Sequence, residues 1–127
     1  MERKVISSDG APKPIGPYSQ AIEAGNLIFC SGQIPLDPQT GQLIQGDISV
    51  QTKRILDNFE AVLKASGSSL EKTVKLTVYL TNLGDFDTLN KVLAERFKQE
   101  PPARAVVPVS SLPKNASVEM DLIAIKV

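Results

Sequence analysis

The last stretch of the chain, residues 117–127, carries apolar side chains at both even and odd positions. The apolar residues at even positions are Val118, Met120 and Leu122, and those at odd positions are Ile123, Ile125 and Val127. Side chains of a strand point alternately to the two faces of its sheet, so this stretch predicts a strand that is buried on both faces. A sheet with such a strand needs a cover on each side, and a partner subunit is the simplest source of the second one.

Two segments predict helices that can cover the first side. Asp47 suits the N-cap of a helix that runs to about Ala65, because its side chain can accept hydrogen bonds from the first backbone N–H groups. Gly67 can take the left-handed conformation that ends this helix. A second helix is predicted to start near Asp85 and to stop before Pro101, since proline lacks a donor and disfavours helix at the residue before it. Each helix has one apolar face: Ile55, Leu56, Phe59, Val62 and Leu63 in the first, and Phe86, Leu89, Leu93 and Phe97 in the second.

The clearest strand is predicted at residues 74–80. Its apolar positions, Val74, Leu76, Val78 and Leu80, alternate with Lys75, Thr77 and Tyr79. This period of two indicates that the four apolar side chains share one buried face.

Two further pairs of strands are predicted. Residues 19–24 and 27–33 are separated by Gly25-Asn26, which suits a tight hairpin turn because both residues tolerate positive φ. Residues 103–109 and 117–127 are joined through a short segment that contains Pro113, and we expect them to form a C-terminal hairpin.

These elements follow one another in the order β, β, α, β, α, β, β, with a short extra strand expected near the N-terminus or near Leu43. The stretch 9–17 is rich in Pro and Gly and predicts an irregular loop, and residues 37–41 predict a further turn. A chain of 127 residues corresponds to one domain, which we expect to span residues 1–127 and to bury roughly 65% of the surface of the unfolded chain. Because each helix has one apolar face, both are expected to cover the same side of one sheet in an α+β fold.

The composition excludes several classes of site. Lys+Arg and Asp+Glu both number 14, so no net charge favours nucleic acid or an anionic membrane as partner. Histidine is absent and Cys30 is the single cysteine, so His-based triads, zinc sites and disulfides within the chain are not expected. No signal peptide and no run of about 20 apolar residues is seen, and the expected location is the cytoplasm.

Three polar residues remain as candidates for chemistry, since no phosphate loop, dinucleotide motif or nucleophile elbow is present. Tyr18 follows a rigid Gly-Pro turn, and its hydroxyl can face a substrate or can cap a loop. Arg104, between small and apolar residues, can bind a carboxylate through both oxygens or can form an ion pair at a sheet edge. Glu119 interrupts an apolar strand, as a site residue or as a solvent-exposed carboxylate.

The chain resembles the Rid (YjgF-type) family along its whole length. The N-terminal half is similar to this family in Gly16-Pro17-Tyr18-Ser19-Gln20-Ala21, Ser31-Gly32-Gln33-Ile34-Pro35 and Gly46-Asp47-Ile48. The C-terminal part resembles its signature in Pro102-Ala103-Arg104-Ala105, Leu112-Pro113-Lys114 and Val118-Glu119-Met120.

The resemblance implies a chorismate-mutase-like α+β fold with one mixed sheet, a homotrimer and sites in the clefts between subunits. It implies hydrolysis of reactive 2-imino acids (2-iminobutanoate and 2-iminopropanoate) to 2-oxo acids and ammonia, with no metal or other cofactor. In this family Arg104 would bind the substrate carboxylate, Glu119 would position the attacking water and Tyr18 would line the pocket. The pocket positions implied further are Ser31, Gly32, Asn90 and Val106.

One position departs from the family pattern. Many deaminases of the family carry a cysteine two residues after the arginine, where this chain has Val106. If that residue acts through its backbone N–H, valine can replace it; if it acts through its thiol, valine cannot.

Two alternatives from other classes remain: a binding or chaperone-like protein, and a protein that acts on RNA. Against the second, the charge is balanced and aromatic residues are not interleaved with basic ones.

Overall fold

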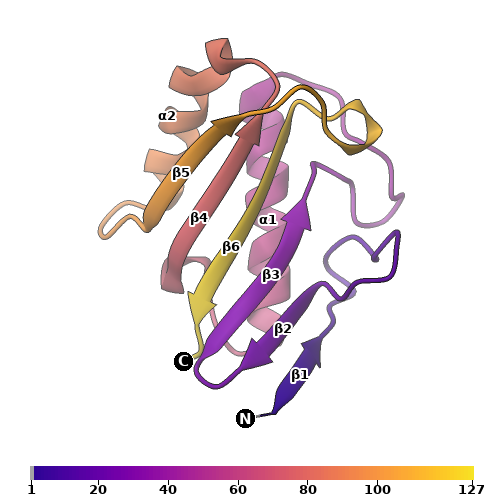
Figure 1. The fold of residues 1–127 in the computed structure, drawn as a ribbon, viewed down its shortest axis with the longest axis vertical. Coiled ribbons are helices and arrows are strands. Elements are labelled where there is room, and N and C mark those ends of the chain that lie inside the picture. Colours follow the sequence, from indigo (N-terminus) through magenta and orange to yellow (C-terminus); the bar gives the residue numbers. More distant parts are fainter. Residues whose placement is uncertain (1) are drawn as a thin grey trace.

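The computed structural model describes residues 2–127, which form one six-stranded mixed sheet with two α-helices on one of its faces (Figure 1). The strands lie in the order β1-β2-β3-β6-β4-β5, and all neighbours are antiparallel except β4 and β5. The predicted α+β class and the position of both helices are thereby confirmed. No helix within residues 2–127 is long and apolar enough to span a membrane.

β1 (Arg3–Ile6), β2 (Ala21–Ala24) and β3 (Leu27–Gln33) form one half of the sheet. β1 is the extra strand expected near the N-terminus, whereas Leu43 makes only an isolated bridge to Leu36. The predicted turn joins β2 to β3, and Gly25 has a φ of 60° there. β2 begins later than predicted, because the Ser19 carbonyl accepts a hydrogen bond from the Ser31 hydroxyl and belongs to the preceding loop.

α1 (Ile48–Ala65) has the predicted start and end. Asp47 Oδ1 accepts a hydrogen bond from the Val50 N–H at 3.1 Å, and Gly67 follows the helix with a φ of 80°. The predicted apolar face packs against the sheet, and its members are fully buried: Ile55, Leu56, Phe59, Val62 and Leu63.

β4 (Thr73–Leu80) confirms the predicted strand but not its first apolar position. Leu76, Val78 and Leu80 face the helices and are buried, whereas Val74 is 37% exposed. The register with β6 shifts between Thr73 and Lys75, so Val74 lies in a bulge. A bulge inserts one residue into the alternation, which is why the predicted burial of Val74 is wrong.

α2 (Phe86–Arg96) connects β4 to β5 (Ala103–Pro108), and these two strands are parallel. Asp85 directly precedes the helix, which ends before Pro101 as predicted. In its apolar stripe Leu89 and Leu93 are buried. Phe86, the first residue of the helix, is only partly buried, and the Arg104 side chain lies over its ring.

The predicted C-terminal hairpin is wrong. β6 (Val118–Ile125) lies between β3 and β4 and is antiparallel to both, so β4 separates it from β5 (Figure 1). The helical crossover through α2 returns β5 parallel to β4 on the outer side of the sheet. The short helical turn at Pro113–Asn115 then precedes the return of the chain to the other side of β4.

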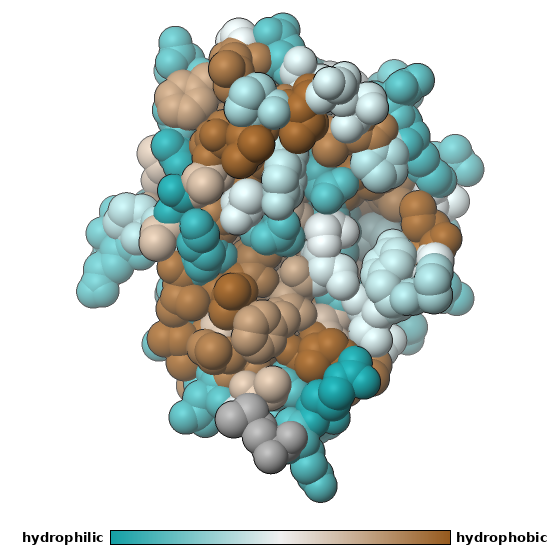
Figure 2. Space-filling model, in the orientation of Figure 1, coloured by the Kyte–Doolittle hydropathy of each residue, from teal (hydrophilic) through white to brown (hydrophobic). Residues whose placement is uncertain are grey.

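The two faces of the sheet differ in their cover. Val118, Met120 and Leu122 of β6 are buried under the helices, whereas Ile125 on the opposite face is 43% exposed. We call this opposite side the open face. Burial of β6 is therefore confirmed on one face, and on the open face half-buried and exposed side chains form an apolar patch, visible as brown in the lower half of Figure 2. The members of this patch are Val5, Ile22, Leu27, Phe29, Ile123 and Ile125.

Candidate active site

Glu119 lies in the interior of the sheet, on β6, with its side chain on the open face. Its neighbours Val118 and Met120 face the core, so the alternation of the strand directs Glu119 away from the helices. The carboxylate lies directly over Gly32: a Cβ atom at Gly32 would be 2.6 Å from Glu119 Oε2. Gly32 belongs to an irregular part of β3, where the register with β6 shifts between Cys30 and Gln33. The absence of a side chain at Gly32 is thus what leaves space for the carboxylate.

The surroundings of Glu119 favour its protonated form more than water does. Burial raises the pKa of the Glu119 carboxyl, and the negative charge of Asp121 raises it further. Asp121 is two positions along the same strand and therefore shares the open face. A carboxyl whose pKa is raised is a stronger base than one in water, and this favours proton transfer to it.

Two neighbours of Glu119 are not among the residues predicted from the sequence. Tyr79 lies opposite Glu119 in the register of β4 and β6, and its hydroxyl donates to Asp121 Oδ2 at 3.2 Å. Burial and the charges of Asp121 and Glu119 raise the pKa of Tyr79. The parity of positions 119 and 121 in a strand could have identified Asp121, whereas Tyr79 requires the pairing of β4 with β6.

Tyr18 and Ser31 lie on the loop-and-strand junction next to Gly32. The Ser31 hydroxyl donates to the Ser19 carbonyl at 2.6 Å, and the Ser31 N–H donates to the Gln20 carbonyl at 3.0 Å. These bonds tie the loop that carries Tyr18 to the irregular part of β3. The Tyr18 side chain is 46% exposed, and its hydroxyl accepts from the Ile15 N–H at 3.2 Å. The loop-capping role is therefore observed, and the exposed ring can also contact a ligand.

The same loop is fixed from within by Gln20. Its buried side chain accepts from the Ser8 N–H at 2.7 Å and donates to the carbonyls of Ser8 and Pro12 at 3.1 and 2.9 Å. A buried amide with these partners holds an irregular segment in one conformation.

Arg104 lies on β5, the edge strand of the sheet, and its side chain extends towards α2. One guanidinium nitrogen donates to Asn90 Oδ1 at 2.5 Å, and the guanidinium lies 5.6 Å from the centre of the Phe86 ring. Among the described residues the ion pairs involve Arg96 and Lys126, and Arg104 takes part in none of them. The alternative of an ion pair within the chain is thus not observed, and the positive charge of Arg104 is available to an anion.

The backbone N–H of Val106 points away from β4, towards the outer edge of the sheet. The Val109 N–H donates to the Leu80 carbonyl, so in this parallel pair the odd positions of β5 point their backbone groups towards β4. The even positions therefore present theirs to the outer edge, and Pro108, which has no N–H, fits this assignment. The side chain of Val106 packs against the core. Of the two ways in which this position can contribute, only the backbone N–H is open to this chain.

Within one chain the structure does not bring Arg104 close to Glu119. Arg104 pairs with Leu76 and Glu119 pairs with Tyr79, on opposite sides of β4. With strands about 4.8 Å apart and a rise of about 3.3 Å per residue, their backbones are separated by roughly 14 Å. Their side chains also point to opposite faces of the sheet. The structure thus divides the predicted residues into two groups: Tyr18, Ser31, Gly32 and Glu119 on one side, and Asn90, Arg104 and Val106 on the other.

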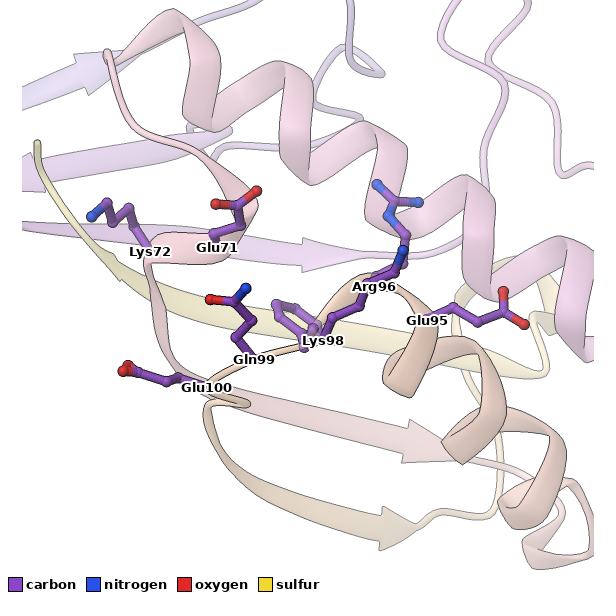
Figure 3. Close-up of a pocket in the computed structure, with 8 residues that line it drawn as sticks. Glu71, Lys72, Glu95, Arg96, Lys98, Gln99 and Glu100 are labelled. Atoms are coloured by element: carbon purple, nitrogen blue, oxygen red, sulfur yellow. The ribbon is translucent and has the colours of Figure 1, made fainter.

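Two clefts border α2. The larger, 600 Å³, lies at the C-terminal end of the helix and is lined by charged residues of both signs, among them Glu71, Lys72 and Glu95 (Figure 3). Arg96, which lines it, is paired with Asp57 and Glu60 of α1. This cleft contains none of the predicted site residues. The second cleft, 440 Å³, lies between α2 and the start of β5, and both Arg104 and Asn90 line it.

Within residues 2–127 no cluster of Cys, Asp and Glu side chains has the arrangement of a metal site. Cys30 is buried on the helix side of β3, and burial raises the pKa of its thiol to about 12, which makes it a poor nucleophile. Arg104 offers a guanidinium that can bind a carboxylate, and Glu119 offers a carboxyl that can accept a proton.

The sequence and the fold both match known proteins. A family model described as Endoribonuclease L-PSP matches residues 8–126. A RutC family protein of Pyrococcus abyssi is 53% identical over 126 residues, which cover 99% of each chain. The human 2-iminobutanoate/2-iminopropanoate deaminase is 43% identical over 124 residues, covering 98% of this chain and 90% of the human one. A solved structure of a Rid family protein of unknown function from Yersinia pestis superposes with a TM-score of 0.95 at 44% identity, covering 98% of this chain and 99% of the other.

Proposed function

Because the chain belongs to the endoribonuclease L-PSP family, which is the YjgF/Rid family, we propose that it hydrolyses reactive 2-imino acids to 2-oxo acids and ammonia. The human relative is named for 2-iminobutanoate and 2-iminopropanoate, and these are the first substrates to test. An imine carbon is already electrophilic, so the reaction requires no metal or organic cofactor.

The observation that carries this proposal is the half-buried Glu119 carboxyl above Gly32, because burial and the charge of Asp121 raise its pKa and make it a stronger base than a carboxyl in water. In the proposed reaction Glu119 accepts a proton from water as the oxygen adds to the imine carbon. The resulting carbinolamine takes up a proton at nitrogen and expels ammonia as the C=O bond forms. One water is consumed, and the 2-oxo acid and ammonia are released.

Arg104 is the proposed carboxylate anchor, because it is a cation without an ion-pair partner among the described residues and is held by Asn90 and Phe86. A bidentate contact with the guanidinium orients the substrate, which reduces the entropic cost of bringing water to the imine. The outward N–H of Val106 is a second donor at the same sheet edge.

The proposed site combines two copies of the chain. Arg104 and Glu119 point to opposite faces of one sheet, so a substrate held by one cannot reach the other within a single copy. The apolar patch on the open face also lacks a cover. A closed trimer in which the Arg104 edge of one copy meets the Glu119 face of the next accounts for both features.

The direct test couples a threonine dehydratase to the purified protein and follows release of 2-oxobutanoate at early times. The proposal predicts that the lag before 2-oxobutanoate appears shortens in proportion to the protein added. A matched reaction with heat-inactivated protein controls for carried-over amines. An unchanged lag at equimolar protein and dehydratase contradicts the proposal.

The description of the family model as an endoribonuclease makes RNA cleavage the second candidate. The equal numbers of acidic and basic residues do not favour it. Incubation of a single-stranded RNA with the wild type and with Arg104→Ala separates the candidates. Cleavage that co-purifies with the wild type and is lost in a variant of the site supports the RNA function.

A further inference from the structure

The second cleft, between α2 and the start of β5, has an apolar interior and a cationic rim, and we call it the groove. Its floor contains Leu76 and Leu93, which are almost completely buried, and Arg104 lies at its mouth beside Asn90. The other lining residues are Ala94, Phe97, Lys98, Pro101 and Pro102.

The charges around this groove have one sign. Arg104 and Lys98 are the ionisable residues in its lining, and no carboxylate is among them. The larger cleft beside it is lined by three glutamates as well as by basic side chains, so the groove differs from its neighbour in charge. Its volume of 440 Å³ lies within the range of small-molecule sites, about 300–1,000 Å³. A cationic mouth over an apolar interior suits a carboxylate that carries an apolar tail.

We propose that this groove binds the side chain of the substrate while Arg104 binds its carboxylate, so that the preferred substrates are 2-imino acids with branched or aromatic apolar side chains. This inference rests on the proposed function, because it uses the same Arg104 contact. It goes further in that it assigns a place to the side chain and orders the substrates by size.

The geometry of a 2-imino acid fits this division. Three groups diverge from its imine carbon: the carboxylate, the side chain and the nitrogen. With the carboxylate on Arg104 and the side chain directed along α2 towards Phe97, the C=N group remains at the edge of β5, where another copy can approach. The ethyl group of 2-iminobutanoate would leave most of the groove filled with water.

Binding of stable 2-oxo acids tests the order of affinities without turnover. Dissociation constants for pyruvate, 2-oxobutanoate, 4-methyl-2-oxopentanoate and phenylpyruvate are measured by ligand-observed NMR titration of the wild-type protein. Each methylene that leaves water is expected to increase affinity by up to about fourfold. The proposal predicts that 4-methyl-2-oxopentanoate and phenylpyruvate bind more tightly than pyruvate, and equal affinities overturn it.

A substitution that fills the groove locates the effect. Ala94 is an exposed residue of α2 that lines the groove, and Ala94→Phe places a ring in it. The ratio of the pyruvate to the 4-methyl-2-oxopentanoate dissociation constant should fall to about one in this variant. Ala65→Phe, at an exposed position at the end of α1, is the matched control and should keep the wild-type ratio. Circular dichroism verifies that both variants are folded.

The outcomes separate this inference from the proposed function. If the dehydratase assay shows no acceleration but the affinity ratio exceeds one and falls in Ala94→Phe, the groove binds apolar 2-oxo acids and the deaminase proposal alone fails. If imines are hydrolysed but the ratio is the same in the wild type and in Ala94→Phe, the groove is not the side-chain site. Absence of any 2-oxo acid binding to the wild type overturns the assignment of Arg104 and the groove together.

Discussion

At the scale of single residues, substitution of Arg104 is expected to remove ligand binding, whereas substitution of Glu119 is expected to remove turnover. Arg104→Ala removes the bidentate, charge-assisted contact of the guanidinium with a carboxylate and should abolish saturable binding of 2-oxo acids. Arg104→Lys should restore little of this binding, because an ammonium lacks the planar geometry of the guanidinium. Glu119→Gln should still bind 2-oxo acids but hydrolyse imines about 10²–10⁴-fold more slowly. Binding titrations and the coupled assay measure both, and full activity of Glu119→Gln contradicts the mechanism.

Asp121 is expected to control the ionisation of Glu119. Its charge raises the pKa of the Glu119 carboxyl, and its own carboxylate accepts a hydrogen bond from the Tyr79 hydroxyl. Asp121→Asn removes this charge, so the pKa of Glu119 should fall. Because a general base acts in its ionised form, the acid limb of the pH–rate profile should move to lower pH in this variant.

The measurement for this prediction is an NMR titration of the Glu119 side-chain carboxyl carbon, which does not depend on catalysis. Asp87→Asn, at an exposed position on α2, is the control and should leave the titration of Glu119 unchanged. A titration that moves to higher pH in Asp121→Asn, or one that does not move, would show that another group sets the pKa. Tyr79 faces Glu119 from β4 and the uncharged Gly32 faces it from β3, while Lys75 lies further along β4, opposite Ile123.

At the scale of elements, the irregular part of β3 determines where the Glu119 carboxylate can lie. Gly32→Ala introduces a methyl group 2.6 Å from Glu119 Oε2, and the flexible end of the glutamate can move aside. We therefore expect a folded protein with reduced turnover, because the carboxylate is displaced from its position. In the Glu119→Gln background the same substitution should have no further effect on turnover, and the double-mutant cycle measures this coupling. Strictly additive losses would contradict the displacement.

The N-terminus of α1 is a second element with a specific contact. Asp47→Ala removes the hydrogen bond from the Val50 N–H and should lower the free energy of unfolding by about 1 kcal/mol. Asp47→Asn keeps an acceptor at this position and should lower it less. Urea denaturation followed by circular dichroism measures both variants. The helix does not contain a predicted site residue, so the two variants should retain imine hydrolysis at temperatures below unfolding.

At the scale of the whole molecule, the apolar patch on the open face predicts self-association. Light scattering should give three times the chain mass of 13.7 kDa for the wild type. Phe29→Glu places a charge in the patch, where Phe29 is 42% exposed, and should yield a lower mass together with loss of turnover. Val50→Glu changes an exposed apolar residue on α1, away from the patch, and should keep both. A wild-type mass equal to one chain at micromolar concentration contradicts this prediction.

Local signals in the sequence were sufficient for most of the elements. The Asp47 cap, Gly67 and the apolar face of α1 specify that helix within the segment itself, because capping bonds and helical periodicity involve residues only a few positions apart. The candidate residues Arg104 and Glu119 were identified because a charge inside an apolar strand is unusual whatever the pairing of that strand.

Only the tertiary structure decided which strands are neighbours. The sequence favoured a hairpin of the last two strands, but the parallel crossover through α2 puts β5 at the edge and leaves the place beside β4 to β6. Strand pairing depends on contacts between distant segments, and alternation alone contains no information about the partner. The same reason explains the bulge at Val74, the contact of Tyr79 with Asp121 and the placement of Arg104 and Glu119 on opposite faces. The sequence identified Arg104 and Glu119 as candidates for chemistry, and the pairing of the strands decided that one copy of the chain does not bring them together.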